Sequence, residues 1–154
     1  AARLQRSPPG LLRHLVYLAA GIPTPGDSWS TPHSPETVAN RVAEAQASGG
    51  LSFPPPDASV FGLSGADRDW VNRRQTPQPF RLYQEPLQFD AERVWSIPHS
   101  FIDCTQPPLP TIDAARQRVR SEPGWQVFEM ATGHDPMVSQ PLALAQLLLD
   151  IARG

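Results

Sequence analysis

The chain has 154 residues, and its 13 basic side chains, all arginine, stand against 15 acidic ones for a formal net charge of -2. This length is typical of one domain or part of one. The near-neutral charge gives no electrostatic reason to expect nucleic acid or an anionic membrane as a partner. Proline is frequent, at 19 residues, which excludes a simple helical bundle because proline interrupts helices.

Cysteine and apolar patterning restrict the class further. The single cysteine, Cys104, has no internal partner for a disulfide, and the histidines do not show zinc-ligand spacing. The longest apolar run, Leu15 to Ile22, is far too short to span a membrane. No basic segment followed by an apolar one opens the chain. We therefore expect a cytoplasmic protein without metal or cofactor.

The chain begins with an expected helix end at residues 1–6, which is stopped by the Ser-Pro-Pro-Gly sequence at 7–10. Residues 11–20 form a nearly continuous apolar run closed by Gly21 and Pro23. This pattern predicts a strand buried on both faces, as found in parallel sheets covered by helices.

The middle of the chain has a different pattern. Ser34-Pro35-Glu36 opens a helix that runs to about Ser48 and ends at Gly49-Gly50. Ser64 to Asp67 has the form of a capping box at the start of a second helix, and a third is plausible from Pro79 to about Gln84. Short helices inserted between sheet strands are typical of a lid, so residues 27–90 are interpreted as a helical lid or cap.

The remainder alternates between strand and helix. Strands are expected at 97–105 and 125–130, with a helix at 111–120 between them. This helix has Ile112, Ala115 and Val119 on one face and arginines on the other. A final helix capped by Ser139 follows, and its expected core-facing stripe is Leu142, Ala145, Leu148, Leu149 and Ala152. This alternation predicts an α/β fold with a mostly parallel sheet. Residues 1–26 and 91–154 are its expected core.

Aromatic side chains are concentrated in the expected lid. They either pack the lid onto the core or line an apolar substrate pocket. The candidates for substrate binding are Trp29, Phe61 and Trp70.

The strongest candidate for chemistry is His134, in the loop Thr132 to Met137 between the last expected strand and helix. A loop that leaves a parallel strand lies at the carboxyl edge of the sheet, where such folds bind ligands. There an imidazole can act as a general base near neutral pH. The alternative is a loop histidine that binds a carbonyl group. His14, His33 and His99 are interpreted as structural.

Four segments in register resemble the α/β-hydrolase fold, and in particular small bacterial and plant esterases related to methylesterases and hydroxynitrile lyases. Residues 15–28 resemble the sixth strand and lid entry, 101–105 the seventh strand, and 133–141 the histidine loop and last helix. Residues 70–80 resemble lid sequence of bacterial members. The resemblance covers essentially the whole chain, which it identifies with the C-terminal part of such a fold.

The resemblance implies a serine hydrolase in which His134 is the triad base. In that family the nucleophilic serine lies on an N-terminal segment upstream of Ala1, together with the oxyanion hole. No G-x-S-x-G motif occurs in the chain; residues 62–66 are a near miss that precedes a lid-type helix. The chain alone is therefore expected to be inactive.

The triad acid is not evident. Relatives carry it at the end of the sixth strand, where this chain has Ala19, or after the seventh, where it has Gln106-Pro107-Pro108. Asp27 and Asp103 are the nearest acids in sequence.

Three functions remain open. The first is an esterase-like hydrolase of carboxylic esters; the second is a non-catalytic relative that binds an apolar small molecule; the third is a lyase of the hydroxynitrile type. The expected partners are a small apolar ester and either the N-terminal half of the same fold or a second copy of this chain. Without such a partner, buried strands would expose apolar side chains, so we expect the isolated chain not to fold stably.

Overall fold

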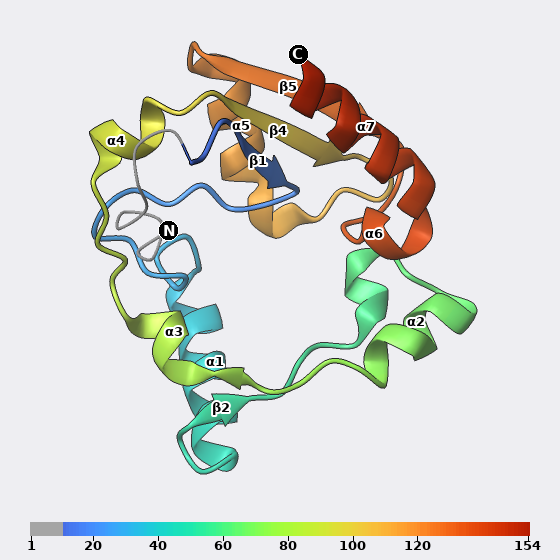
Figure 1. Cartoon of the computed structure of the whole chain (residues 1–154). Helices are drawn as coiled ribbons and strands as arrows, with labels where there is room; N and C mark the ends of the chain where they lie inside the picture. The colour runs from blue at the N-terminus through green and yellow to red at the C-terminus, as the bar shows by residue number, and fades with distance from the viewer. Residues whose placement is uncertain (1–10) are drawn as a thin grey trace.

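A computed structural model describes residues 11–154 (Figure 1). The helix end expected at 1–6 and its stop at 7–10 lie outside the described residues. A three-stranded parallel sheet has the order β1-β4-β5, formed by Leu15–Leu18, His99–Cys104 and Trp125–Met130. The predicted α/β fold with a parallel sheet is thus confirmed, and β5 has the predicted bounds.

The first strand differs from its prediction. β1 has four residues within the apolar run 11–20, and Val16 on it is 37% exposed. β1 pairs with β4 along one side and forms one edge of the three-stranded sheet. The prediction of a strand buried on both faces was wrong for this chain. Such burial needs a strand paired along each edge and helices packed on each face, and among the described residues β1 pairs only with β4.

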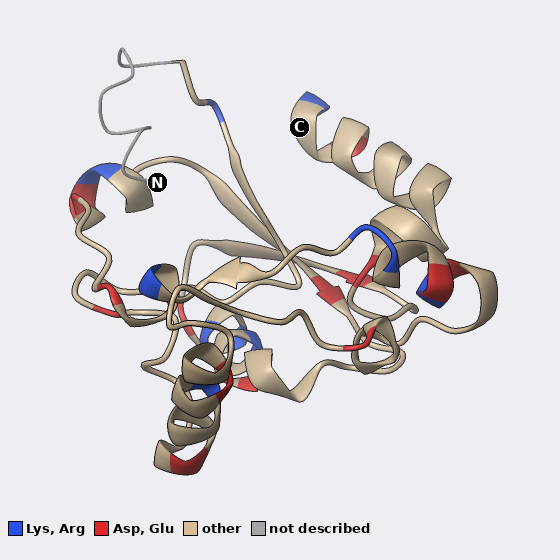
Figure 2. Cartoon of the chain, turned by 90° about the horizontal axis from the view of Figure 1, so that it is seen from below, with Lys and Arg blue, Asp and Glu red and all other residues tan. Residues whose placement is uncertain are grey.

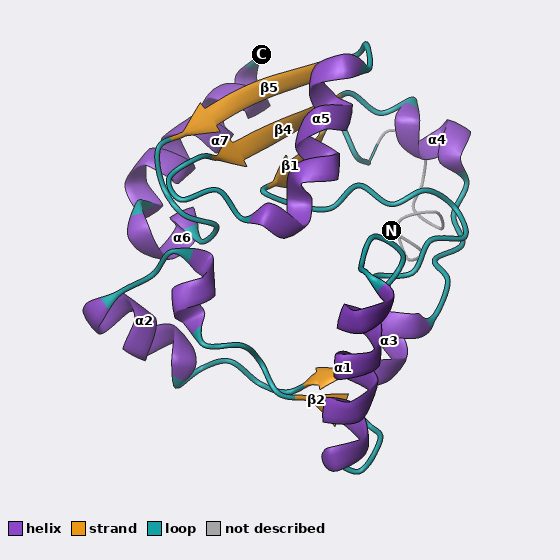
Figure 3. Cartoon of the chain, turned by 180° about the vertical axis from the view of Figure 1, so that it is seen from behind, coloured by secondary structure: helices purple, strands orange, loops and turns teal. Residues whose placement is uncertain are grey.

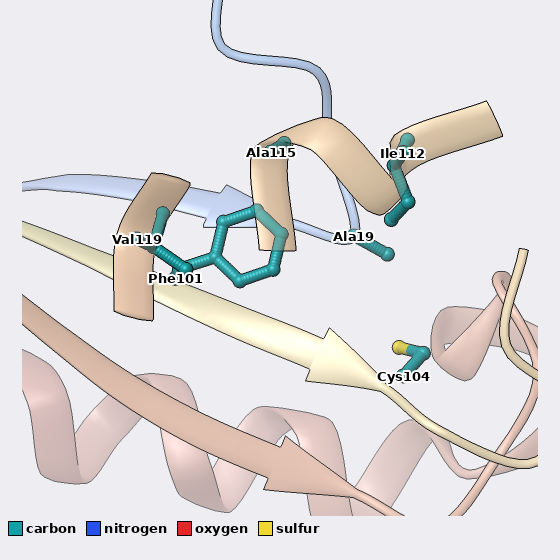
Figure 4. Packing of buried hydrophobic residues seen from close by; sticks show 6 residues of the cluster. All are labelled: Ala19, Phe101, Cys104, Ile112, Ala115 and Val119. Atoms are coloured by element: carbon teal, nitrogen blue, oxygen red, sulfur yellow. The ribbon is translucent and has the colours of Figure 1, made fainter. Parts of the chain in front are cut away.

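One face of the sheet is covered by α5 (Asp113–Ser121), which follows a short 3-10 turn, η3 (Pro110–Ile112) (Figure 3). The predicted inward residues Ile112, Ala115 and Val119 are all buried. They pack with Phe101 of β4, whose ring is completely enclosed (Figure 4). Burial of a side chain of this size stabilises the fold by about 1.5–3 kcal/mol.

The opposite face is covered by α7 (Pro141–Arg153), which follows the single turn α6 (Pro136–Ser139) (Figure 1). Leu144 and Ile151 pack against Ile102 and Met130 of the sheet. The predicted stripe was wrong: Leu142 is 85% exposed, and its companions Ala145, Leu148, Leu149 and Ala152 are exposed as well. The helix is apolar on both sides, so its spacing did not determine which side meets the sheet.

The predicted cap of this last helix was also wrong. α7 begins at Pro141 with Gln140 as its N-cap. Ser139 belongs to α6, and its hydroxyl bonds the Thr132 hydroxyl at 2.6 Å.

The segment 27–90 contains the predicted helices. α1 (Pro35–Ala47) is capped by the Ser34 side chain, which accepts from the Thr37 backbone N–H. α2 (Gly65–Asn72) and α3 (Phe80–Gln84) follow, although Ser64 makes no side-chain cap to α2. Four elements in or next to this segment were not predicted: the strands of a short antiparallel pair, β2 and β3 (Ser52–Phe53 and Gln78–Pro79), a 3-10 turn, η2 (Ala58–Phe61), and α4 (Ala91–Trp95), just beyond the segment.

Charged side chains are interspersed over the described residues, with arginines and acids side by side (Figure 2). Ion pairs between neighbouring turns of one helix, such as Arg118 with Glu122 at 2.9 Å, account for several of them. This distribution agrees with the near-neutral composition.

Candidate active site

His134 lies where β4 and β5 both end. The Thr105 N–H donates to the Met130 carbonyl at 3.0 Å, and the Gln106 N–H donates to the Thr132 carbonyl at 2.9 Å. These bonds join the two loops that leave the strands. The histidine loop is therefore at the carboxyl edge of the sheet, as predicted.

A turn from the segment 27–90 packs on this loop. The His134 backbone N–H donates to the Phe61 carbonyl at 2.9 Å, and the two rings lie 5.3 Å apart between centroids. Phe61 closes η2, and Figure 1 shows the chain before α2 reaching α6. Of the three predicted substrate-binding residues, Phe61 is the one that contacts His134.

The other two aromatic candidates have different neighbours. Trp29 packs with Tyr83 of α3 at 6.4 Å between ring centroids, and it is about half exposed. Trp70 of α2 is also about half exposed and carries the Arg74 guanidinium over its ring at 4.2 Å. α2 and α3 lie well apart (Figures 1 and 3). The structure therefore does not gather the three residues into one cluster.

Within residues 11–154, the imidazole of His134 has one buried nitrogen without a hydrogen-bond partner, and its pKa is lowered. Among the described residues, the Nδ1 atom is buried without a hydrogen-bond partner. A buried polar atom left unpaired costs about 1–3 kcal/mol, so this atom is a position where a partner group would bind favourably. Burial lowers the pKa of His134 below its ordinary value of 6.5, with Asp135 opposing this shift and Arg116 adding to it. The imidazole is therefore neutral at pH 7 and can accept a proton.

Asp27 and Asp103, the acids nearest in sequence to the two expected positions of the triad acid, bind other groups. Asp103 is buried, with its carboxylate oxygens 2.7 Å from both Arg116 and Arg120 of α5. Asp27 accepts hydrogen bonds from the backbone N–H and the hydroxyl of Thr24, which lower its pKa. Both carboxylates therefore stabilise local structure, and neither forms a hydrogen bond or an ion pair with His134.

Asp135 was not considered in the sequence analysis. Its carboxylate is half-buried beside His134, burial raises its pKa, and the charge of His134 opposes that shift. The His-Asp dipeptide at 134–135 was the signal that could have identified it. The two positions where the resemblance implies an acid hold Ala19, directly after β1, and the Gln106–Pro107 cis peptide.

The other histidines have structural partners. His14 Nε2 bonds the Ser100 hydroxyl at 2.8 Å, His33 Nδ1 bonds the Tyr83 hydroxyl at 2.9 Å, and His99 Nδ1 bonds the Ile97 carbonyl at 2.9 Å. These contacts agree with the interpretation of the three histidines as structural residues, which stays a prediction.

Residues 11–154 contain neither a metal-binding cluster nor a membrane-spanning helix. In this part of the chain, no three His, Cys, Asp or Glu side chains are grouped so that they could hold a metal ion. Across the same residues no helix combines the length and the apolar character that crossing a membrane requires.

Known proteins share this architecture. No family model matches the chain. It is 34% identical over 152 residues to a carbendazim hydrolyzing esterase of Nocardioides sp. (strain SG-4G), a match that covers 89% of this chain and 60% of that protein. An extracellular α/β-hydrolase from a Paenibacillus species superposes with a TM-score of 0.70 at 20% identity, over 90% of this chain and 61% of that one. A crystal structure of the pyrethroid hydrolase PytH gives 0.63 at 21% identity, over 99% and 64%.

The sheet, the helices on its two faces and the histidine loop thus define the C-terminal part of an α/β-hydrolase fold. The chain shares this fold with the structures it matches and spans about three fifths of the length of these relatives.

Proposed function

We propose that this chain is the C-terminal part of a serine hydrolase that cleaves carboxylic esters, with His134 as the triad base. The observation that carries the proposal is the His134 imidazole at the carboxyl edge of the parallel sheet, neutral at pH 7 and with a buried, unpartnered Nδ1. The nucleophilic serine and the oxyanion hole belong to an N-terminal segment that is not in these 154 residues.

In the proposed reaction, His134 Nε2 accepts the proton of the serine hydroxyl as its oxygen attacks the ester carbonyl. The tetrahedral intermediate collapses when the imidazolium returns that proton to the departing alkoxide, which leaves an acyl-enzyme. His134 then takes a proton from water as the water oxygen attacks the acyl carbonyl, and the imidazolium returns that proton to the serine oxygen when the bond to serine breaks and the carboxylic acid is released. The low pKa of His134 keeps it ready for the first step at neutral pH.

The proposed substrate is a small to medium apolar ester, and residues 27–90 are the proposed lid over it. Trp29, Phe61 and Trp70 remain the proposed binding residues; Phe61, which contacts the histidine, has the strongest support. The names of the relatives, an esterase that hydrolyses carbendazim and a pyrethroid hydrolase, support an organic ester-like substrate. A cytoplasmic location is proposed and can be checked by fractionation, since one structural neighbour is described as extracellular.

The proposed partner is the N-terminal half of the same fold, with a second copy of the chain as the alternative. The exposed leucines of α7 and the free side of β1 support a covering partner. Without it, we expect no activity from this chain.

One observation favours a second candidate. Neither usual acid position holds a carboxylate, which fits a non-catalytic relative that binds an apolar molecule. A hydroxynitrile-type lyase would use the same base. Analysis of the reaction products would distinguish it from an ester hydrolase.

The test is intact mass spectrometry of the purified protein before and after a fluorophosphonate probe. An adduct on a longer chain or on a co-purifying segment supports the serine hydrolase. A folded species of 16.9 kDa without an adduct would contradict it and leave the binding function.

A further inference from the structure

We infer that the turn Asp57–Gly62 is a positioning element that holds His134 in its orientation, and that Phe61 acts through the histidine as well as at the substrate. This inference rests on the proposed function of His134. In a serine triad, the acid both orients the imidazole and stabilises its charged form. Here the imidazole has no acidic partner at Nδ1 among residues 11–154, so a different group must supply the orientation.

The first contact is made by the backbone. The Phe61 carbonyl accepts the His134 N–H at 2.9 Å, a bond between residues far apart in the sequence. Gly133 makes this approach possible, because a Cβ on Gly133 would collide with the Phe61 carbonyl oxygen and lie 3.1 Å from the Gly62 Cα. The backbone at Gly133 has no positive φ, so glycine is needed here for space.

Gly62 completes the contact from the other side. It has φ +83°, and an added Cβ would lie 2.8 Å from the Pro107 side chain and 3.1 Å from the Gly133 Cα. Pro107 is in the loop after β4, which is itself bonded to Thr132 through Gln106. Three chain segments therefore meet at two glycines beside His134.

The turn is held firmly by the helix that follows it. The Asn72 side chain of α2 accepts the Ala58 N–H at 2.8 Å and donates to the Asp57 carboxylate at 2.8 Å. Asp57 also accepts the Ser59 N–H at 2.8 Å, and the Gln75 amide donates to the Pro56 carbonyl at 3.1 Å. These bonds fix the geometry of the turn independently of His134.

The Phe61 ring lies against the imidazole, with 32° between the ring planes. Because burial lowers the pKa of His134, we expect this ring, which lies against the imidazole, to contribute to that burial. Removing this ring should let water reach the imidazole and raise its pKa, whereas a merely structural role for Phe61 would change stability alone.

The first experiment compares Phe61→Ala with Val60→Ala, an exposed neighbour in the same turn. NMR titration of the His134 imidazole is carried out on the purified protein with any segment that co-purifies. We expect the pKa in F61A to rise toward 6.5 and that in V60A to match the parent. A folded F61A with the parental His134 pKa would overturn the role of the ring.

The second experiment compares Gly133→Ala with Gly21→Ala, since neither glycine has a positive φ and a Cβ on Gly21 meets nothing within 4 Å. We expect exchange of the His134 amide hydrogen to be about tenfold faster or more in G133A, because loss of the Phe61 bond opens the loop locally. Unchanged exchange in G133A would overturn the positioning role.

A G133A variant that does not fold would still support the close contact if G21A folds, and F61A then remains the deciding variant. Neither measurement needs the serine. If the protein does not react with a fluorophosphonate, but F61A changes the His134 pKa and G133A speeds exchange of the His134 amide, the proposed function is wrong and the positioning contact still holds.

Discussion

The two helices on opposite faces of the sheet differ in how much of their apolar surface is buried. α5 has small and branched apolar residues toward the sheet and arginines on its other sides, two of which bind the buried Asp103. α7 buries Leu144 and Ile151 and leaves leucines exposed on its outer side. The α5 side of the sheet is therefore packed by residues of this chain, whereas the outer side of α7 exposes leucines and β1 forms an edge of the sheet; these are the surfaces that the proposed partner would cover. The histidine loop leads into α6 and α7, on the side with the exposed leucines.

The largest expected effect concerns the base itself. His134→Gln should lower ester hydrolysis by about 10⁴-fold or more in the enzyme that carries the nucleophile, because loss of a triad base disables the proton transfer. Initial rates on a short apolar ester check this. His99→Gln is the control, since His99 bonds the Ile97 carbonyl away from the site. Equal losses in both variants would contradict a specific role for His134.

The α5 side of the sheet can be broken at Asp103. Asp103→Asn removes the buried carboxylate that pairs with Arg116, whose side chain is 11% exposed, and leaves Arg116 paired with the exposed Asp113; removal of one member of a buried ion pair costs about 3–5 kcal/mol. Urea unfolding measures the change in the free energy of unfolding. Glu129→Gln is the control, because its contact with Arg120 is exposed and worth about 1 kcal/mol or less. A stable D103N would show that the cluster is dispensable.

The other side of the sheet can be tested on α7. Leu144→Ala should cost about 2–5 kcal/mol, because Leu144 is buried against the sheet. Leu142→Gln should change the stability of this chain by about 0.5 kcal/mol or less, since Leu142 is exposed. The same L142Q change should weaken binding of the N-terminal half. If L142Q destabilises the chain as strongly as L144A, the assignment of inner and outer sides is wrong.

A smaller effect is expected in the pH profile. The base must be neutral, and burial places the pKa of His134 below 6.5. Activity should therefore stay constant as the pH is lowered from 7 and should fall only when the pH passes below the pKa of His134. The negative charge of Asp135 raises the pKa of His134. Asp135→Asn should therefore move the acidic limb to still lower pH, measured as kcat/KM against pH. A limb that moves upward would contradict the assigned direction.

The sequence predicted features that side-chain periodicity determines. The strand at 125–130, the inward face of α5 and the place of His134 after β5 all follow from local apolar patterns and strand order. The orientation of α7 could not be predicted, because leucines occupy both of its sides. The contact between Phe61 and His134 could not be predicted either. It depends on a backbone carbonyl and on Gly62 and Gly133, which are 71 positions apart in the sequence and form no recognisable motif.

The central claim is that His134 is the base for a serine outside these residues. The most direct measurement is peptide mapping of the fluorophosphonate adduct in the purified protein and in H134Q. We expect an adduct on a serine of a segment N-terminal to Ala1, and we expect this adduct to be lost in H134Q. An adduct on a serine within the 154 residues, or equal labelling of H134Q, would contradict it.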